Sequence, residues 1–301
     1  MDELCLIRLS WVVFLHAALL SIESIVIEML TTQLQLEPLV IAANSIPIAG
    51  AALLLITLGS EKKKQAFAVF RQWKYLLSGS VLLAIGVFAW YDSVRNVGAS
   101  KEGLLAGPLE TIVILFLARV ALQEKLSRAQ LAGVMIALGG FFATVMSAGN
   151  AQLLITWGDI EAVLSAVAFG SGIIFITKLA KTYSALQITG SSLFISGIVL
   201  AVVLWTTSAP AIEPPDWTVL ALFSLLPLSA ALTYVIGLSR IGASLTSTIA
   251  SFSILLTIVF QLTLLVLDVQ VILPANIPLA VAGGALGVFG IYLIHRTNNR
   301  H

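Results

Sequence analysis

Long, uninterrupted apolar stretches constrain this sequence more than any other feature. A helix that crosses a bilayer needs roughly 20 mainly apolar residues, because the hydrocarbon core is about 30 Å thick. The 301-residue chain offers ten such stretches, separated by short connections: 10–31, 38–59, 74–94, 102–121, 128–147, 157–177, 184–206, 218–238, 244–267 and 276–295. The sequence therefore predicts an all-α integral membrane protein of ten transmembrane helices.

The overall composition agrees with a lipid environment. Hydrophobic residues make up 59% of the chain and charged residues only 10%, with a mean hydropathy of +1.03. Soluble domains carry about 25% charged residues and need polar cover over their surface. A net charge of +1, without a basic patch interleaved with aromatic residues, gives no indication of a nucleic-acid partner. The expected partners are the lipid bilayer and a small-molecule substrate.

The distribution of lysine and arginine predicts the orientation. An even number of spans places both termini on one side, and with these boundaries only Arg95 and Lys101 of the 16 basic residues fall on the other side. Basic residues favour the cytoplasmic side, so both termini are expected to be cytoplasmic in a multi-pass protein of the cell (plasma) membrane. All tryptophans fall near predicted span ends, as amphipathic rings do: Trp11, Trp73, Trp90, Trp157, Trp205 and Trp217.

Signatures of enzymes and metal sites are missing from the sequence. Cys5 is the only cysteine, and the three histidines (His16, His295 and His301) lack metal-ligand spacing. No Walker A loop is present to bind ATP. The sequence predicts no catalytic residue, metal or cofactor.

Short repeated motifs divide the chain into two halves. Val97-Gly98-Ala99-Ser100 recurs as Ile241-Gly242-Ala243-Ser244, and Ala132-Gly133 with Gly140 recurs as Ala282-Gly283 with Gly290. We therefore expect a five-helix repeat in residues 1–150 and a second in residues 151–301. Because five is odd, the second copy must cross in the opposite sense, which makes an inverted repeat with a binding site near the midplane.

These motifs resemble those of the drug/metabolite transporter superfamily, in particular its ten-span EamA-type permeases. The resemblance rests on the order and spacing of several short stretches over nearly the whole chain: Asn96–Ser100, Gly107-Pro108, Gln123–Ser127, Leu131–Gly133, Leu138–Gly140, Ser239–Ser244 and Leu279–Gly283. It implies a permease, commonly an exporter of amino acids, related metabolites or amphiphilic compounds.

Two carboxylates fall well inside predicted spans. An ionisable side chain at mid-membrane costs at least about 2.5–3.5 kcal/mol on insertion scales, so it is usually paired, directed into a cavity or functional. Glu23 lies past the middle of the first span and shares a face with His16. Glu110 follows Gly107 and Pro108 in the fourth span, where the proline is expected to disturb the helix and free a carbonyl group. Both could bind protons or a cationic group, or each could be a protonated acid bonded to a neighbouring helix.

Four uncharged residues are further candidates for substrate contact. Asn44 could bind a ligand or join two helices, and Trp90 could stack on a ligand or belong to an aromatic belt. Tyr234 lies deep in the eighth span, and Ser247 belongs to an unusually hydroxyl-rich ninth span that could instead pack closely. Glu28 and Glu102 are interpreted as interfacial, and Asp159 and Glu161 as acids that favour a helix N-terminus.

The sequence favours a secondary transporter that works by alternating access, with Glu110 and Glu23 binding substrate, protons or both. An uncoupled facilitator or exchanger, and a non-transporting membrane scaffold subunit, remain as alternatives. A cavity at the midplane that contains Glu110 would favour transport, whereas tightly packed halves would favour the scaffold. The sequence leaves substrate, direction and oligomeric state (monomer or dimer) open.

Overall fold

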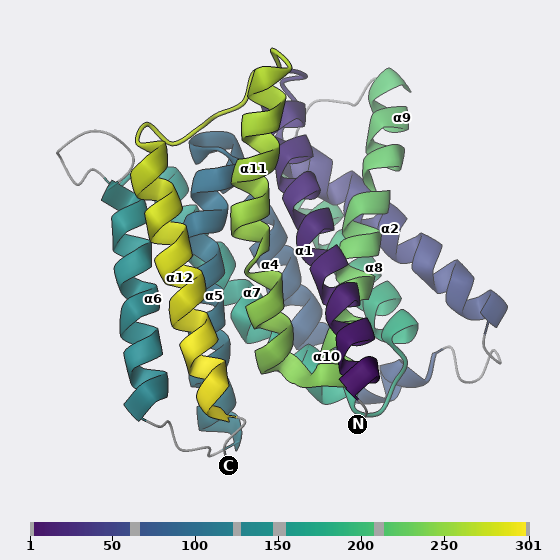
Figure 1. The fold of residues 1–301 in the computed structure, drawn as a ribbon. Coiled ribbons are helices and arrows are strands. Elements are labelled where there is room, and N and C mark those ends of the chain that lie inside the picture. The colour runs from purple at the N-terminus through teal and green to yellow at the C-terminus, as the bar shows by residue number, and fades with distance from the viewer. Residues whose placement is uncertain (1–2, 61–66, 123–127, 147–154, 208–213, 299–301) are drawn as a thin grey trace.

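The computed structural model describes residues 3–60, 67–122, 128–146, 155–207 and 214–298, and every regular element in these ranges is a helix (Figure 1). The elements are α1 Glu3–Thr32, α2 Pro38–Ser60, the 3₁₀-helix η1 Ala68–Gln72, α4 Trp73–Val97, α5 Ala99–Leu122, α6 Arg128–Met146, α7 Trp157–Ala180, α8 Ala185–Thr206, α9 Pro214–Phe223, α10 Leu225–Ala250, α11 Ser253–Val266 and α12 Ile277–Asn298. The expectation of an all-α fold is confirmed for the described residues.

Length and apolar composition suit many of these helices to a bilayer. Within the described ranges, six helical segments are long and apolar enough to cross a membrane, and two shorter apolar helices accompany them. Large hydrophobic side chains are exposed along the outside of the bundle, including Leu55, Phe116, Val266 and Phe289. Such a surface needs lipid around it, so the chain is a multi-pass membrane protein.

Local sequence explains where several helices begin. At the start of α7, the backbone N–H of Asp159 donates to the Thr156 side chain at 3.3 Å, and the Asp159 carboxylate accepts from the Thr156 N–H at 2.9 Å. Ser184 and Gln187 form the same reciprocal arrangement at the start of α8. These capping boxes satisfy N–H groups that have no partner within the helix.

The helices overlap all ten predicted spans, but the predicted ninth span is not one straight helix. The eighth span corresponds to α9 and the part of α10 before Gly242, whose non-helical backbone puts a kink in α10, and the part of α10 after this kink enters the range predicted for the ninth. A kink at Ser251 and Phe252 then separates α10 from α11. There the Phe252 N–H donates to the Ile249 carbonyl at 3.1 Å, and the Ile254 N–H donates to that of Ser251 at 3.2 Å, which are three-residue spacings.

The interruption expected at Pro108 is not seen, because α5 stays helical from Ala99 to Leu122 with Pro108 inside it. The disturbed helix lies instead in the second half, at Gly242 and at the α10–α11 kink. Proline in a helix interior usually costs a hydrogen bond and bends the helix, but neighbouring helices can support it. Here the Pro108 ring packs against α12 at Gly287, where an added Cβ atom would lie 3.1 Å from the ring.

The repeated Gly-Ala-Ser motifs adopt the same unusual backbone conformation. Gly98, between α4 and α5, has φ 85° and ψ 155°, and Gly242, inside α10, has φ 82° and ψ 165°. They are the only glycines with positive φ among the described residues. Only glycine adopts this region without strain, so the duplicated sequence motif has a duplicated structural role.

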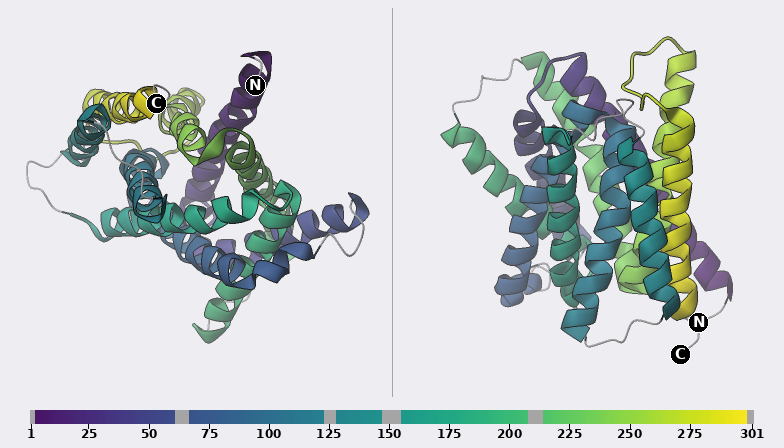
Figure 2. Two further views of the ribbon diagram at one scale, coloured as in Figure 1. Left: turned by 90° about the horizontal axis from the view of Figure 1, so that it is seen from below. Right: turned by 90° about the vertical axis from the view of Figure 1, so that its left-hand side faces the viewer.

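Helices from the two halves pack in pairs: α6 along α12, α2 along α8, α4 along α7 and α1 along α10. At the α6–α12 crossing, a Cβ atom on Gly140 would lie 2.6 Å from the Gly287 nitrogen, and one on Gly290 would lie 2.5 Å from the Ala137 nitrogen. The two backbones are therefore in direct contact, which only small residues allow. Figures 1 and 2 show α6 and α12 side by side at one edge of the molecule.

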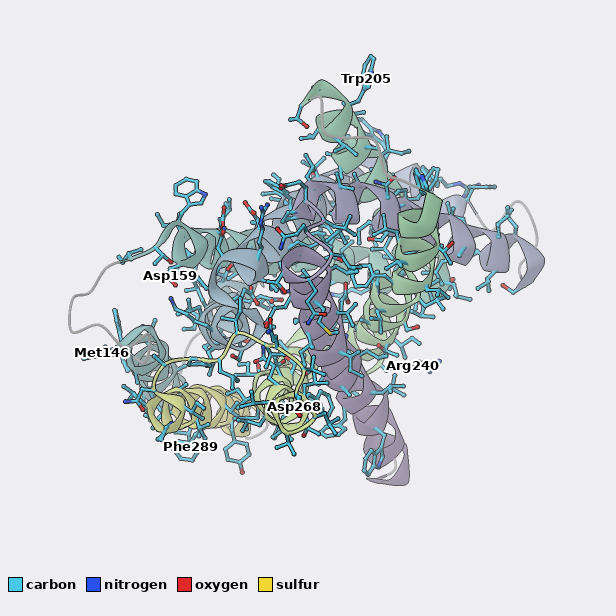
Figure 3. The ribbon with its side chains drawn as sticks, turned by 90° about the horizontal axis from the view of Figure 1, so that it is seen from above. Met146, Asp159, Trp205, Arg240, Asp268 and Phe289 are labelled. Atoms are coloured by element: carbon cyan, nitrogen blue, oxygen red, sulfur yellow. The ribbon has the colours of Figure 1, made fainter. Side chains whose placement is uncertain are left out.

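The start of α1 and the end of α12 lie at the same end of the bundle (Figures 1 and 2). We call the opposite end, where α1 ends and α5 begins, the far end. Five of the six tryptophans have exposed side chains, as an interfacial belt requires, and Trp205 projects away from the bundle at 85% exposure (Figure 3). Trp90 is the exception, because it is buried.

Candidate functional site

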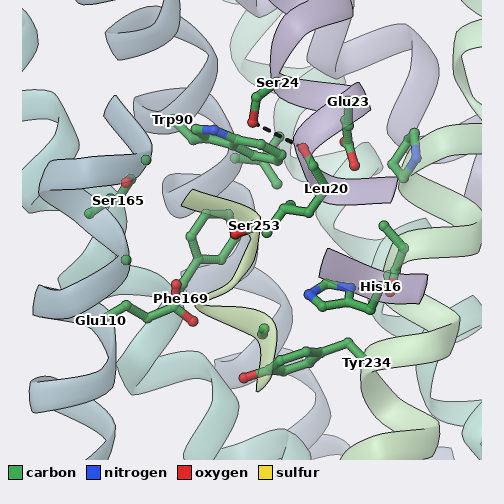
Figure 4. Close-up of a pocket in the computed structure, with 18 of the residues that line it drawn as sticks. His16, Leu20, Glu23, Ser24, Trp90, Glu110, Ser165, Phe169, Tyr234 and Ser253 are labelled. Atoms are coloured by element: carbon green, nitrogen blue, oxygen red, sulfur yellow. Dashed lines mark hydrogen bonds between the residues drawn. The ribbon is translucent and has the colours of Figure 1, made fainter. Parts of the chain in front are cut away.

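A cavity of about 210 Å³ lies in the interior of the bundle, between helices of both halves (Figure 4). Most of its wall is apolar. The polar side chains that line it come from α1, α5, α7, α10, α11 and the α10–α11 kink: His16, Glu23, Ser24, Glu102, Glu110, Thr111, Ser165, Tyr234, Ser247, Ser251, Ser253 and Thr257. An apolar hollow with a few convergent polar groups is the usual form of a small-molecule site.

Glu23 faces the cavity from α1 and is held by a tyrosine. Its side chain is buried, with 2% of the residue exposed, and its Oε1 accepts a hydrogen bond from the Tyr91 hydroxyl at 3.0 Å. Tyr91 belongs to α4 and is itself fully buried. This bond fixes the carboxyl group of Glu23 against a neighbouring helix, and its second oxygen accepts no hydrogen bond from the described residues.

Glu102 lies on the cavity wall near the far end. It is 3% exposed, and its Oε1 accepts from the Ser165 hydroxyl of α7 at 3.3 Å. The indole of Trp90 is close enough to interact with it. Trp90 in turn meets Phe169 edge to face, with ring centroids 6.1 Å apart. Glu102 and this aromatic pair therefore share this part of the cavity, and Figure 4 shows the two rings beside Ser165.

Glu110 and Tyr234 occupy the other part of the cavity and interact electrostatically (Figure 4). Among the described residues, no hydrogen-bond or ion-pair partner is found for the Glu110 carboxyl group, and the buried Tyr234 hydroxyl has none either. Glu110 is partly exposed, whereas the Tyr234 hydroxyl is buried, and a buried polar group without a partner needs an explanation such as a ligand or water. These two groups are therefore available to a solute.

His16 supports Tyr234 from α1. Its Nδ1 lies 2.8 Å from the Ala230 carbonyl oxygen of α10, and its ring lies 4.8 Å from the Tyr234 ring. Because a carbonyl only accepts hydrogen bonds, Nδ1 must carry the proton, which leaves Nε2 as the second polar atom of the ring. A second link from α1 is the Ser21 hydroxyl, which donates at 2.9 Å to the Ser253 carbonyl beside the α10–α11 kink.

The structure brings together five of the six residues predicted to bind substrate or protons. Glu110, Glu23, Trp90, Tyr234 and Ser247 all line the cavity. Asn44 does not line it, and the Asn44 amide donates at 2.7 Å to the Val40 carbonyl of its own helix.

The interpretation of Glu28 and Glu102 as interfacial residues is wrong, because both are buried. Glu28 is 1% exposed and joins three segments at the far end. Its Oε2 accepts from the Ala99 N–H at 2.8 Å and from the Gln261 amide at 2.7 Å, and its Oε1 accepts from the Ile272 N–H. The start of α5 and the loop before α12 cover it, and sequence position alone could not show that cover.

Three other acids of the far end are also paired. Lys101 forms an ion pair with Asp159 at 2.6 Å, and both side chains are almost buried. Asn96 donates to Glu161 at 2.8 Å, and Arg95 pairs with Glu37 at 2.5 Å on the surface. Thus both basic residues assigned to this side have acidic partners, and these polar contacts tie α4 and α5 to α7 and to the residue that precedes α2.

Comparison with known proteins identifies the chain. A model described as the EamA-like transporter family matches residues 9–146 and again residues 156–296. The chain belongs to this family. The resemblance found in the sequence is thereby confirmed, and the cavity lies inside a member of a membrane transporter family.

Structural comparison supports the fold of this EamA-like chain. One solved structure, a crystal structure of a protein, matches it with a TM-score of 0.64 and 19% sequence identity, covering 93% of this chain and 98% of the other. At that identity the likeness concerns the fold alone. No curated protein sequence matches significantly.

Glu102 is the main site residue that sequence reasoning missed in this EamA-like chain. A usable signal existed: Glu102, Ala106 and Glu110 follow one another at four-residue intervals, so they share a face of α5. All three line the cavity. Phe169 and Ser165, which lie four residues apart on α7, carried no comparable signal because small and aromatic residues are common throughout the sequence.

Proposed function

We propose that this EamA-like protein is a secondary transporter of small metabolites, working by alternating access without ATP and without catalytic activity of its own. The observation that carries the proposal is the interior cavity into which Glu23, Glu102 and Glu110 project from two helices. Its presence favours transport over a scaffold subunit, whose halves would pack without a hollow. We further propose that the protein lies in the plasma membrane with both termini cytoplasmic, and that it exports its substrate.

The proposed architecture is an inverted repeat of five plus five membrane crossings. If each helix is replaced by its counterpart in the other half, the packed pair α4–α7 becomes the packed pair α10–α1. The pairs α2–α8 and α6–α12 are unchanged by the same exchange, because each consists of two counterparts. The matching conformations of Gly98 and Gly242 support the same relation. Such repeats let two bundles rock around a fixed central site.

Proton coupling is the finer part of the proposal. Glu110 has no described partner and Glu23 only a hydroxyl, so each could take a proton in one state of the cycle and release it in another. Intramembrane carboxylates commonly serve as proton relays in transporters. An uncoupled facilitator or exchanger remains the alternative, because the same acids could contact a cationic solute directly.

Reconstituted liposomes test this function. The full chain should move solute down an imposed gradient in a screen of amines, amino acids and amphiphiles, and solute flux should drive a proton flux that a trapped pH dye reports. Glu110→Gln and Glu23→Gln should abolish the pH dependence. Glu37→Gln, which alters an acid in the exposed pair with Arg95, is the matched control and should behave like the parent.

Two outcomes would overturn parts of the proposal. If both cavity variants keep full transport and full pH dependence, proton coupling by these acids is wrong and the uncoupled alternative holds. If the parent protein moves no solute of any class in the screen, the scaffold interpretation replaces transport.

A further inference from the structure

The charge inventory of the cavity is one-sided. Three glutamates line it, whereas no lysine or arginine among the described residues does, and the only basic ring is that of His16. The same chain does pair its buried acids elsewhere: Lys101 neutralises Asp159 at the far end. The acidic character of the cavity is therefore a local property and not a result of scarce basic residues.

Each cavity acid still has capacity for a donor. Glu23 accepts one hydroxyl, from Tyr91, Glu102 accepts one from Ser165 and also interacts with the Trp90 indole, and Glu110 has no described partner. A carboxylate can accept about four hydrogen bonds, so these three groups are far from saturated. By contrast, Glu28 accepts three N–H groups from three segments. A solute that carries N–H donors and positive charge would fill this deficit.

Aromatic rings in the cavity provide further groups that can bind a cation. Trp90, Phe169 and Tyr234 line the cavity together with the acids. Ring faces attract ammonium groups, most strongly where water is excluded. The cavity of about 210 Å³ is smaller than the sites of drug-sized ligands, which start near roughly 300 Å³. The solute should therefore be small and partly apolar.

Binding of a solute carboxylate in this cavity would be unfavourable. It would enter an apolar hollow that already holds three acids and offers no described cationic side chain, and burying an unpaired charge is costly. A free amino acid brings such a carboxylate, whereas the amine formed by its decarboxylation does not. The charges of the cavity should therefore favour the amine over the amino acid.

We infer that the cavity selects small organic ammonium ions with an apolar or aromatic group and no carboxylate, in preference to amino acids. The inference rests on the proposed transport function and specifies its substrate class. Glu110 and Glu102 supply the charge partners at the two parts of the cavity, and Trp90 with Phe169 supplies the ring surface.

Matched pairs of solutes test the inference directly. Phenethylamine against phenylalanine, and isoamylamine against leucine, differ only by the carboxylate. In liposomes with the full chain, radiolabelled uptake of each amine should exceed that of its amino acid at least tenfold. As a measurement that needs no variant, the amine and not the amino acid should raise the thermal unfolding midpoint of the purified protein.

Variants then locate the effect. Glu110→Gln and Glu102→Gln should each lower the amine-induced shift in midpoint and the amine uptake at least fivefold, while Glu37→Gln should leave both unchanged. Trp90→Phe should retain more amine transport than Trp90→Leu, because only the former keeps a ring.

Three results would overturn the inference: an amino acid carried as well as its amine, neither solute carried or bound, or amine transport that is unchanged in both glutamate variants. The first leaves the transport function intact, because flux is still observed. Failure of the transport function itself is recognised separately, by the absence of flux for every solute in the wider screen.

Discussion

At the residue scale, the site is defined by polar groups that the fold leaves unsatisfied. An unpaired buried hydroxyl or carboxyl carries a desolvation cost of about 1–3 kcal/mol. The Tyr234 hydroxyl has no partner among the described residues, whereas the Tyr91 hydroxyl donates to Glu23 at 3.0 Å. Two tyrosines of the same chemistry are thus in opposite situations, one prepared for a solute and the other committed to structure.

Replacing each tyrosine by phenylalanine separates these roles. Tyr234→Phe removes a group that bonds nothing described, so the unfolding free energy should stay the same or rise slightly, while the KM for a transported amine rises several-fold. Tyr91→Phe removes a real hydrogen bond and should lower the unfolding free energy by about 1 kcal/mol. Thermal unfolding in detergent and liposome kinetics measure both effects. Equal loss of stability in the two variants would contradict this assignment.

The sequence predicts site residues well where a charged side chain lies inside an apolar span, because its burial there is costly. It predicts them poorly where the packing of other segments determines whether a side chain is buried. Glu23 and Glu110 stand out because each is an ionisable side chain well inside an apolar span. Glu102 and Glu28 sit near span ends, where water is the expected neighbour, but α7 and the loop before α12 enclose them. The polarity of Asn44 made it a candidate for ligand contact, yet its amide donates a hydrogen bond within its own helix.

At the element scale, glycines mark the places where helices turn or touch. Gly98 and Gly242 share a positive φ, but their surroundings differ. A Cβ on Gly98 would lie 2.8 Å from the Ile272 side chain, whereas a Cβ on Gly242 would meet nothing within 4 Å. The duplicated motif therefore explains the shared backbone, and the loop before α12 explains the difference.

Alanine at these two positions should show that difference. Both Gly98→Ala and Gly242→Ala incur backbone strain of about 1–3 kcal/mol. Only Gly98→Ala adds a clash with Ile272, so its unfolding midpoint should fall clearly further than that of Gly242→Ala. Thermal unfolding of the two variants and the parent makes the comparison, and a larger loss in Gly242→Ala would refute it.

Close contact between α6 and α12 leads to a second element-scale prediction. Gly140 and Gly139 are adjacent on α6, but a Cβ on Gly140 would strike the α12 backbone, whereas one on Gly139 would meet nothing within 4 Å. Gly140→Ala should destabilise the protein by about 1–3 kcal/mol through overpacking. Gly139→Ala should be neutral or stabilising by up to about 1 kcal/mol, since alanine favours helix. Unfolding midpoints that fall equally in both variants would contradict the crossing.

The helices themselves were largely predictable, because their apolar length is a direct property of the sequence. The helices overlap all ten expected ranges, and the repeated Gly-Ala-Ser motifs recur in backbone conformation. The kink at Ser251 and Phe252 was not predictable, since no proline or glycine stands there. The expected disturbance at Pro108 failed for the opposite reason: packing against α12 supports the proline within a continuous α5.

At the scale of the whole molecule, the far end is tied together by polar contacts that centre on Glu28. This one carboxylate joins α1 to the start of α5 in the first half, and to α11 and the loop before α12 in the second. Alternating access requires such links to break and reform as the halves move. We therefore expect Glu28 to hold the far end closed in the arrangement seen here.

Glu28→Gln tests this role, because it keeps the shape of the side chain but replaces one acceptor oxygen by a donor. The carboxylate accepts three N–H groups, and the amide would leave at least one of them unpaired at a cost of about 1–3 kcal/mol. A change of that size shifts a two-state equilibrium by about 5- to 150-fold. In a Cys5→Ser background, Ser251→Cys places a thiol on the cavity wall, and a membrane-impermeant maleimide applied from the far end should label it about tenfold faster when Glu28→Gln is present.

Glu37→Gln, which alters the exposed ion pair at the same end, should leave the labelling rate unchanged. If Glu28→Gln also leaves that rate unchanged while the protein stays folded, the carboxylate stabilises the far end without controlling access, and the closing element must lie among the Lys101–Asp159 and Asn96–Glu161 contacts instead.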